Sequence, residues 1–306
     1  MSAKETVLIT GGSGLVGSRL SQLLMDEGYN VIHLGRKKSR NGSILTYLWD
    51  LDEKTVEVEA LLRADHIVHL AGAGVADARW TDERKKEIIS SRVDSAELLF
   101  TELKKLQLKP ISFVSASAVG YYGNTGSNLV SEETEPGKDF LAEVCVAWED
   151  AIKPFETLGS RVVILRTGIV LSEKGGALPK TAAPIKFGIG ATLGDGTQYV
   201  PWIHIDDLCR QYIYAIKNEK VKGVYNATAP QPVTNKEFTD SIADALGKKT
   251  ISAPAPAFVL RLAMGEMADA VLGGQRTSSM KMQEAGFTFN YPQIYPALKD
   301  IFERKV

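Results

Sequence analysis

The sequence predicts an α/β protein with a doubly wound parallel sheet and a smaller, mostly helical C-terminal lobe, and three observations support this fold class. An apolar, β-rich run at residues 6–10 leads directly into glycines spaced G-x-x-G-x-x-G. Strand-like and helix-like segments then alternate through the first half of the chain. After Thr167, glycine-rich loops and helical segments replace this alternation. Since alternating strands and helices are joined by right-handed crossovers, we expect the first half to build one parallel sheet.

Six strands and two long helices are expected in the first half. The apolar runs predict strands at 6–10, 31–34, 44–48, 65–70, 111–115 and 161–166. Helical patterns run over about 82–108 and 139–158. The apolar face of the first helix includes Ile88, Ile89, Leu98, Leu99 and Leu103.

The second half is expected to form most of the smaller lobe. Two apolar segments, 203–205 and 224–226, look like returns to the sheet. Thr234 is followed three residues later by Glu237, a capping-box spacing that predicts a helix start, and residues 254–256 open another helical segment. The expected division is a sheet domain over 1–170 plus about 201–228, and a substrate and C-terminal lobe over about 171–200 plus 229–306.

The composition is that of an ordinary globular protein. The chain has 306 residues and a net charge of −1, which gives no reason to expect nucleic acid or an anionic membrane as a partner. Its two cysteines, Cys145 and Cys209, form no C-x-x-C pair, so we expect neither a disulfide framework nor a metal site. The first residues lack a secretory-signal pattern, and no apolar run approaches the roughly 20 residues of a membrane span. We therefore expect a cytoplasmic protein.

The glycine motif predicts a dinucleotide-binding site of the Rossmann type. Gly11 allows the tight turn after the strand, Gly14 lets the backbone approach the phosphates, and Gly17 lets the next helix pack close to the strand. The N-terminus of that helix adds unpaired N–H groups and a partial positive charge. The alternative is an ordinary glycine turn, which the strand–turn–helix context disfavours.

The end of the second strand favours NADP(H) over NAD(H). NAD-specific sites usually carry an acid there, about 20 residues beyond the glycines. Here residues 33–38 read His-Leu-Gly-Arg-Lys-Lys, and no acid follows until Asp50. Arg36 can meet a 2′-phosphate with its charged fork, and Lys37 can add a point charge, although a solvated basic loop is the alternative. Asp50-Leu51 is either an adenine neighbour or an ordinary strand end.

Several further segments match one superfamily in their order and spacing. They are residues 70–73, 115–123, 165–171 and 201–207. With the glycine motif, they make the chain resemble the extended short-chain dehydrogenases/reductases, the nucleotide-sugar epimerase-like group. Other details are similar to one atypical branch, epimerase-like proteins with a C-terminal extension; these details are residues 79–80, 86–92, 274–276, 285–287 and 291–292. The resemblance covers essentially the whole chain.

The resemblance implies a set of cofactor contacts around the glycine motif, the basic cluster and a long helix. With their immediate neighbours, the expected contacts are Gly11, Ser13, Gly14, Leu15, Val16, Gly17, Gly35, Arg36, Lys37, Leu70, Ala71, Gly72, Glu87, Arg92 and Val170. Glu87 and Arg92 lie about 140° apart around a helix, so both can border a cleft without stacking. A solvated charge pair is the alternative for these two residues.

The catalytic pair of the superfamily is missing. Relatives use Tyr-x-x-x-Lys on the helix after the fifth strand, where the phenol exchanges a proton while the nicotinamide exchanges a hydride. With Glu149 as the usual trailing acid, the Tyr position falls on Leu141 and the Lys position on Cys145. Leucine has no proton to exchange and cysteine has no fixed positive charge, so the standard mechanism does not carry over.

Four other residues are candidates for catalysis. Ser117 lies near the superfamily's catalytic serine, and Tyr121 and Tyr122 follow at once. Glu143 is on the helix that has lost the pair. Each has an alternative role: a strand-end hydroxyl bonded to backbone, aromatic packing, or a solvated glutamate. Arg276 could reach an anionic substrate or lie on the surface.

Two functions stay open at this point. The first is an NADP(H)-dependent oxidoreductase or epimerase-like enzyme of atypical mechanism, acting on a small molecule that no residue cluster identifies. The second is a non-catalytic dinucleotide-binding protein, such as a redox sensor or regulatory partner. The resemblance also leaves a homodimer open, because many relatives form a four-helix interface from the helices that correspond to 82–108 and 139–158.

Overall fold

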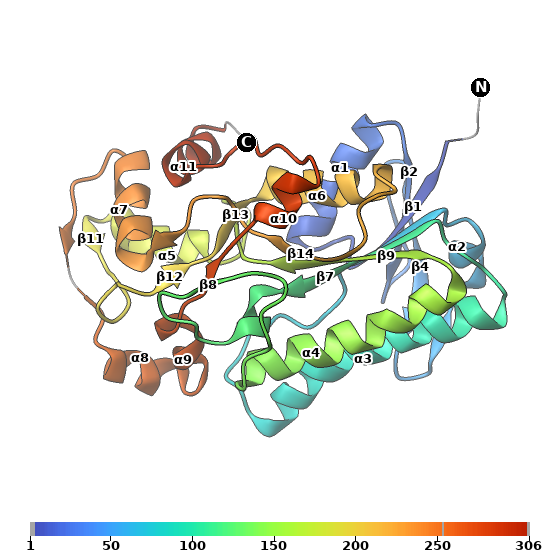
Figure 1. Ribbon diagram of the computed structural model, residues 1–306, viewed down its shortest axis with the longest axis horizontal. Helices are drawn as coiled ribbons and strands as arrows, with labels where there is room; N and C mark the ends of the chain where they lie inside the picture. Colours follow the sequence, from blue (N-terminus) through green and yellow to red (C-terminus); the bar gives the residue numbers. More distant parts are fainter. Residues whose placement is uncertain (1–3, 253, 305–306) are drawn as a thin grey trace.

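The computed structural model describes residues 4–252 and 254–304, and a nine-stranded sheet forms its centre (Figure 1). The outer ends of the expected domains, residues 1–3 and 305–306, lie outside the described residues. The strands of this sheet are β1 (Thr6–Thr10), β2 (Asn30–Gly35), β3 (Ser39–Asn41), β4 (Ile44–Asp50), β5 (Thr55–Val56), β6 (His66–His69), β7 (Ser112–Ala118), β9 (Arg161–Thr167) and β14 (Gly223–Ala227). They run in the order β14-β9-β7-β6-β1-β2-β4-β3, with β5 paired to β4.

The strand order reverses next to β1. The chain adds β2 and β4 on one side of β1 and then crosses to add β6, β7 and β9 on the other side, with parallel pairing throughout this set. Sheets of this kind bind ligands in the crevice at the carboxyl ends of the strands, where the order reverses. The predicted doubly wound fold is therefore confirmed, and its ligand crevice lies between β1 and β6.

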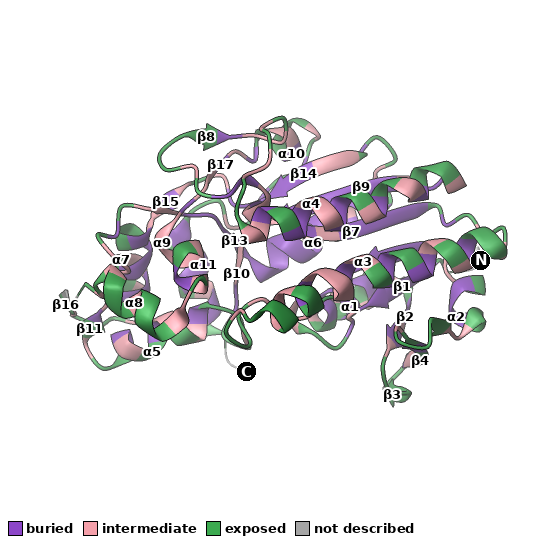
Figure 2. Cartoon of the chain, turned by 90° about the horizontal axis from the view of Figure 1, so that it is seen from below, coloured by how far each residue is buried: buried purple, intermediate pink, exposed green. Residues whose placement is uncertain are grey.

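Helices cover both faces of the sheet (Figures 1 and 2). α1 (Leu15–Asp26) and α6 (Ile205–Lys217) share a core with Val7 and Ile9 of β1. α3 (Asp82–Lys105), α4 (Phe140–Ile152) and the short α2 (Val58–Leu62) share another core with Leu8. Successive side chains of a strand point to opposite faces, so the continuous apolar run of β1 is buried on both sides.

The two long helices end earlier than expected. α3 stops at Lys105 rather than near residue 108, and α4 stops at Ile152 rather than near 158. A 3-10 helix, η2 (Lys153–Leu158), continues from α4. Pro154 explains this change, because proline lacks the N–H of a helical hydrogen bond and its ring clashes with the preceding turn.

The chain leaves the sheet after β9 and builds a smaller lobe. β10 (Ile169–Leu171) pairs with β13 (Trp202–His204) in a separate two-stranded sheet, so the expected return of 203–205 to the main sheet is wrong. A Cβ at Gly168 would lie 2.5 Å from Pro201 O, which shows how closely the two segments cross where the chain departs. The other expected return is confirmed, because β14 extends the sheet beside β9.

The remaining elements of the chain are short helices and strands, most of which belong to this lobe. They are η1 (Val119–Tyr122), β8 (Leu129–Val130), α5 (Leu178–Lys186), β11 (Ile189–Gly190), β12 (Tyr199–Val200), β15 (Val233–Thr234), α7 (Asn235–Ala245), β16 (Ile251–Ser252), α8 (Ala257–Met264), α9 (Met267–Leu272), β17 (Arg276–Thr277), α10 (Met280–Glu284) and α11 (Ile294–Glu303). Thr234 and Glu237 form the expected capping box of α7, and α8 follows Pro256 as expected.

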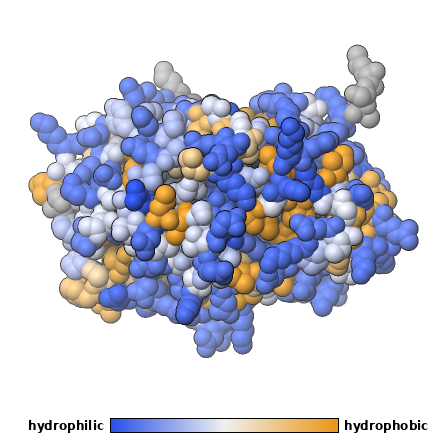
Figure 3. Space-filling model, viewed as in Figure 1, coloured by the Kyte–Doolittle hydropathy of each residue, from blue (hydrophilic) through white to orange (hydrophobic). Residues whose placement is uncertain are grey.

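The apolar residues of α3 and of the surface are the features that relate to a homodimer or a membrane as partner. Leu98 and Leu99 of α3 are buried in the chain's own core, and Phe100 packs against Phe155, so a dimer stays a prediction. Figure 3 shows hydrophilic side chains over most of one face, with apolar side chains in separate groups. In the described part of the chain, no helix is both long and apolar enough to cross a membrane.

Buried histidines should make the stability of this fold depend on pH. Burial lowers the pKa of His69, at the end of β6, from 6.5 to about 3, and it also lowers those of His33, His66 and His204. Below about pH 6.5 these histidines become protonated in the unfolded chain but stay neutral in the folded chain. The unfolded chain therefore binds more protons, and the free energy of unfolding should fall as the pH drops below about 6.5. For His69 alone the loss approaches roughly 1.4 kcal/mol per pH unit between its two pKa values.

Urea unfolding at about pH 7.5, 6.5 and 5.5 measures this effect. The His69→Gln variant, although less stable, should show a shallower dependence because it lacks the most strongly shifted group. Equal stability of the wild-type protein across this range would contradict the prediction.

Candidate functional site

The chain turns from β1 into α1 through the glycine motif. Gly11 has a φ of +69°, a left-handed conformation that glycine adopts without strain, and Gly14 N donates to Gly11 O at 3.0 Å to close the turn. No side chain caps the start of α1, and its first turn holds no acidic residue. The N–H groups at this helix N-terminus are therefore open to an anion.

Gly17 of the motif and Gly12, which lies between the motif glycines, are confined by their neighbours. A Cβ on Gly17 would lie 2.5 Å from Gly11 O, and a Cβ on Gly12 would overlap the ring of His33. The His33 ring lies 2.8 Å from Ser21 Oγ of α1, within hydrogen-bonding distance. The turn, α1 and β2 thus pack at distances that only glycine permits.

A hydroxyl group at the end of β1 ties this strand to the loop after β6. Thr10 Oγ1 accepts hydrogen bonds from Leu70 N and Ala71 N, both at 3.1 Å. Since its acceptor positions are used, its own proton goes to His69 Nδ1, 2.9 Å away. The neutral His69 then donates from Nε2 to Ser95 Oγ of α3 at 3.2 Å. This chain of bonds sets where the loop after β6 begins.

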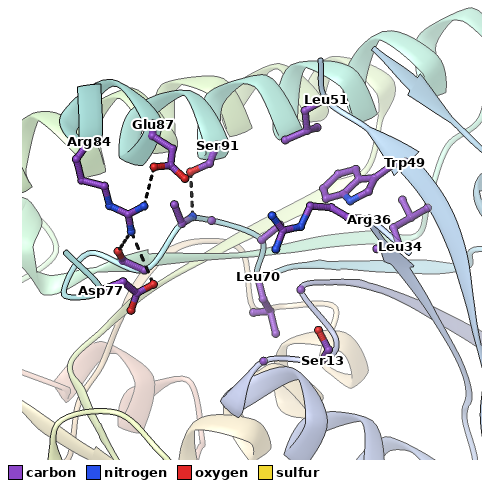
Figure 4. Close-up of a pocket in the computed structure, with 17 residues that line it drawn as sticks. Ser13, Leu34, Arg36, Trp49, Leu51, Leu70, Asp77, Arg84, Glu87 and Ser91 are labelled. Atoms are coloured by element: carbon purple, nitrogen blue, oxygen red, sulfur yellow. Dashed lines mark hydrogen bonds and ion pairs between the residues drawn. The ribbon is translucent and has the colours of Figure 1, made fainter. Parts of the chain in front are cut away.

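A cavity of about 490 Å³ lies at the carboxyl ends of β1, β2, β4 and β6, beside α3 (Figure 4). Most of the predicted cofactor contacts border it: Gly11, Ser13, Gly14, Gly35, Arg36, Leu70, Ala71, Gly72 and Glu87. A second cavity of about 640 Å³ shares Ser13 and Arg36 with the first and adds Lys37. The fold thus brings these separate segments of the sequence to one place.

The remaining predicted contacts border neither cavity. Leu15 borders a different cavity of about 430 Å³, and Val16, Gly17 and Val170 border none of the three. Arg92 is buried, donates to Ala73 O at 3.0 Å and places its guanidinium 4.9 Å from the ring centre of Trp148. In this structure the buried Arg92 side chain stabilises the loop after β6, which borders the cavity.

The cavity wall also contains residues that the sequence did not single out. They are Leu34, Trp49, Ala73, Gly74, Asp77, Arg84 and Ser91. Arg84 and Ser91 are three residues before and four residues after Glu87 on α3, so the helical face that carries Glu87 could have indicated both. Asp77 and Gly74 lie on the loop after β6, for which local sequence carried no such signal.

Leu51 borders the cavity, whereas Asp50 does not. The carboxylate of Asp50 accepts hydrogen bonds from Asp52 N at 2.9 Å and Glu53 N at 3.0 Å. Of the two roles open for Asp50, these bonds correspond to the ordinary strand-end role. Leu51 is left as the apolar neighbour of the site.

A buried polar network connects two of the four catalytic candidates. Ser117 donates to Glu149 at 2.7 Å, and Arg166 donates to both oxygens of the same carboxylate at 2.8 Å. Arg166 also donates to Tyr122 Oη at 3.0 Å, and Tyr122 donates to Asn226 at 2.7 Å. Burial raises the pKa of Tyr122 to about 12. The hydroxyl hydrogens of Ser117 and Tyr122 are thus held by internal partners.

The other two candidates lie in different surroundings. Tyr121 is half-buried, and its ring centre lies 3.3 Å from the guanidinium carbon of Arg166. Glu143 is exposed on α4, outside the network. None of the four candidates borders the two cavities at the glycine motif.

Leu141 and Cys145, at the positions of the missing catalytic pair, have packing roles in this structure. Leu141 lies against Gly120, where a Cβ on the glycine would be 3.2 Å from the leucine Cβ. Cys145 donates a long hydrogen bond to Ala118 O at 3.5 Å, and burial raises the pKa of its thiol to about 12. A neutral thiol of this kind supplies neither a fixed charge nor a nucleophile.

The link through Thr10 can be tested with an isosteric change. Thr10→Val leaves Ala71 N–H and His69 without their partner, whereas Leu70 N–H keeps its bond to the backbone oxygen of Thr10 at 3.2 Å. We therefore expect a loss of roughly 1–3 kcal/mol in stability and weaker dinucleotide binding. Urea unfolding and a fluorescence titration with NADPH measure the two effects. Thr6→Val is the matched control on the same strand, because the Thr6 hydroxyl makes no hydrogen bond within the described residues. Equal behaviour of the two variants would contradict the role of Thr10.

Comparison with known proteins places this site in a family. Residues 7–228 match the model of the NAD dependent epimerase/dehydratase family, and residues 255–301 match DUF1731, a domain of unknown function. An epimerase family protein of Mycobacterium leprae is 36% identical over 298 residues, covering 97% of this chain and 95% of that protein. One from Bacillus subtilis is 34% identical over 297 residues, covering 96% and 97%.

Solved structures agree with the sequence relatives. A human epimerase family protein solved with NADPH has a TM-score of 0.86 at 30% identity, covering 98% of this chain and 100% of that chain. A nucleoside-diphosphate sugar epimerase from Corynebacterium glutamicum has a TM-score of 0.77 at 36% identity, covering 97% of this chain and 57% of that chain. The resemblance to epimerase-like extended short-chain dehydrogenases/reductases is confirmed, and this chain belongs to the NAD dependent epimerase/dehydratase family.

Proposed function

We propose that this protein binds NADP(H) at the glycine motif and uses it as an oxidoreductase or epimerase-like enzyme on a small molecule. The open N-terminus of α1 would hold the pyrophosphate, and Arg36 with Lys37 would hold the 2′-phosphate. Trp49, Leu51 and the loop after β6 would enclose the adenosine. When bound, the nicotinamide supplies or accepts a hydride.

The cofactor assignment rests on the residues at the end of β2, where an acid is absent and two exposed cations are present. The position at the end of β2, where NAD-specific sites usually carry an acid, is Gly35, which has no side chain to bind the ribose; a Cβ there would lie 2.9 Å from Thr46 Cγ2, so an acidic residue would require Thr46 to shift. Arg36 and Lys37 follow, both exposed, and neither forms an ion pair with any described residue. The human structural relative, which was solved with NADPH, supports the same assignment.

The cofactor preference can be tested at Arg36. Arg36→Met removes a charged donor to the 2′-phosphate, so NADPH affinity should fall roughly tenfold to a hundredfold while NADH affinity changes little. Fluorescence titrations with both cofactors measure this difference. Arg40→Met is the matched control, because Arg40 is a nearby exposed arginine that borders neither cavity at the motif. An equal loss for NADPH and NADH would count against 2′-phosphate recognition.

For the reaction, we infer that Tyr121 is the proton donor. The hydroxyl hydrogens of Ser117 and Tyr122 are committed to Glu149 and Asn226, whereas Tyr121 Oη has no hydrogen-bond partner among the described residues. The guanidinium of Arg166 packs against the face of the Tyr121 ring and would hold the ring in place.

The same observations give a second candidate function. Leu141, Cys145 and the committed hydroxyls leave few groups for proton transfer, which favours a non-catalytic NADP(H) sensor or regulatory protein. A small-molecule substrate, a cytoplasmic location and a homodimer remain predictions from the sequence.

Turnover separates the two functions. With NADPH and a panel of carbonyl compounds, a reductase should show loss of nicotinamide absorbance. With NADP⁺ and nucleotide sugars, an epimerase should convert the sugar, measured by chromatography, because epimerisation regenerates the cofactor. In either assay Tyr121→Phe should reduce the rate roughly a hundredfold or more with NADPH affinity unchanged. Tight NADPH binding without turnover by the wild-type protein would favour the sensor. Full turnover by Tyr121→Phe would exclude this tyrosine as the donor.

A further inference from the structure

Three residues on one face of α3 hold the loop after β6. Arg84 donates to Gly74 O, Ser91 Oγ accepts from Ala73 N at 2.9 Å, and Arg92 Nη1 donates to Ala73 O at 3.0 Å. The spacings of seven and eight residues bring all three side chains to one side of a helix. Figure 4 shows Arg84 and Ser91 reaching from the helix toward the loop that forms the cavity wall.

The part of the cavity near α3 carries opposite charges. Glu87 and Asp77 both border the cavity, with side chains 57% and 74% exposed, whereas Arg84 is only 16% exposed. Arg84 Nη1 lies 2.6 Å from Glu87 Oε2, and Arg84 Nη2 lies 3.7 Å from Asp77 Oδ2. Unpaired, these two carboxylates would repel the phosphates of a dinucleotide across the cavity.

We propose that Arg84 is a positioning residue for an anionic dinucleotide: it fixes the loop at Gly74 and offsets one of the two negative charges of Glu87 and Asp77, so that an acid-bearing wall accepts a negatively charged ligand. This inference rests on the proposed function, since it concerns the same site. Arg84 Nε is buried and has no partner among the described residues, so the contacts of Arg84 with Gly74, Glu87 and Asp77 all run through its two terminal nitrogens.

The next residue along α3 provides a matched control. Lys85 Nζ pairs with Glu266 at 2.5 Å and lies 5.0 Å from the ring centre of Phe140, and Lys85 does not border the cavity. Lys85→Gln therefore removes the same charge from the same helical turn without exposing Glu87 or Asp77.

NADPH titration tests the electrostatic half of the proposal. At about 50 mM salt, Arg84→Gln should bind NADPH roughly tenfold more weakly than the wild type, and Lys85→Gln should bind it normally. Because salt screens the repulsion, the deficit of Arg84→Gln should shrink at about 500 mM salt. The double variant Asp77→Asn/Arg84→Gln restores the net charge of the three residues and should recover most of the affinity. A deficit that is unchanged by both salt and the second substitution would overturn the neutralising role, because a purely structural role would give that result.

Hydrogen exchange tests the loop-fixing half without any cofactor. In the free protein, Arg84→Gln should speed amide exchange over residues 73–77, while Lys85→Gln should leave it as in the wild type. Equal exchange in all three proteins would overturn this half. If the wild type binds neither NADPH nor NADH, the proposed function fails, and the exchange experiment still decides whether Arg84 holds the loop.

Discussion

The close approach of β1 and β6 at their carboxyl ends is the constraint on which the rest of the site depends. The left-handed Gly11 turns the chain where a side chain would press on the Leu70 backbone, at 3.0 Å from its carbonyl carbon. The Thr10 hydroxyl then accepts hydrogen bonds from the first two N–H groups of the loop after β6 and donates one to His69. Because Thr10 and His69 are buried, leaving their side chains without hydrogen-bond partners would cost free energy. The cavity floor is therefore rigid on both sides of the switch point.

Charge is distributed unevenly around this floor. At the end of β2, Arg36 and Lys37 are exposed and unpaired within the described residues, which suits a phosphate group. On the α3 side, Arg84 offsets one of the two negative charges of Glu87 and Asp77. A dinucleotide with a 2′-phosphate would thus meet free cations at one end of the cavity and a less negative wall at the other.

The region that normally carries catalysis is occupied by a structural network. Arg166 donates two hydrogen bonds to Glu149 and one to Tyr122 Oη. Its guanidinium also packs against the ring of Tyr121. A buried cation needs such partners, because an unpaired charge in the interior is costly. The network explains why Ser117 donates to Glu149. Of the three hydroxyl groups of Ser117, Tyr121 and Tyr122, that of Tyr121 makes no hydrogen bond to a described residue.

The sequence alone determined the doubly wound sheet and the glycine turn, because strand–helix alternation and glycine spacing are local patterns with local physical causes. It also indicated the basic end of β2. Only the tertiary structure decided that 202–204 pair with β10, that Asp50 serves a turn, and that Arg92 supports a loop. It alone joined Ser117 and Tyr122 to one arginine, and brought Arg84 to Gly74. Such contacts depend on which segments meet across the sheet, and no pattern within a single segment carries that information.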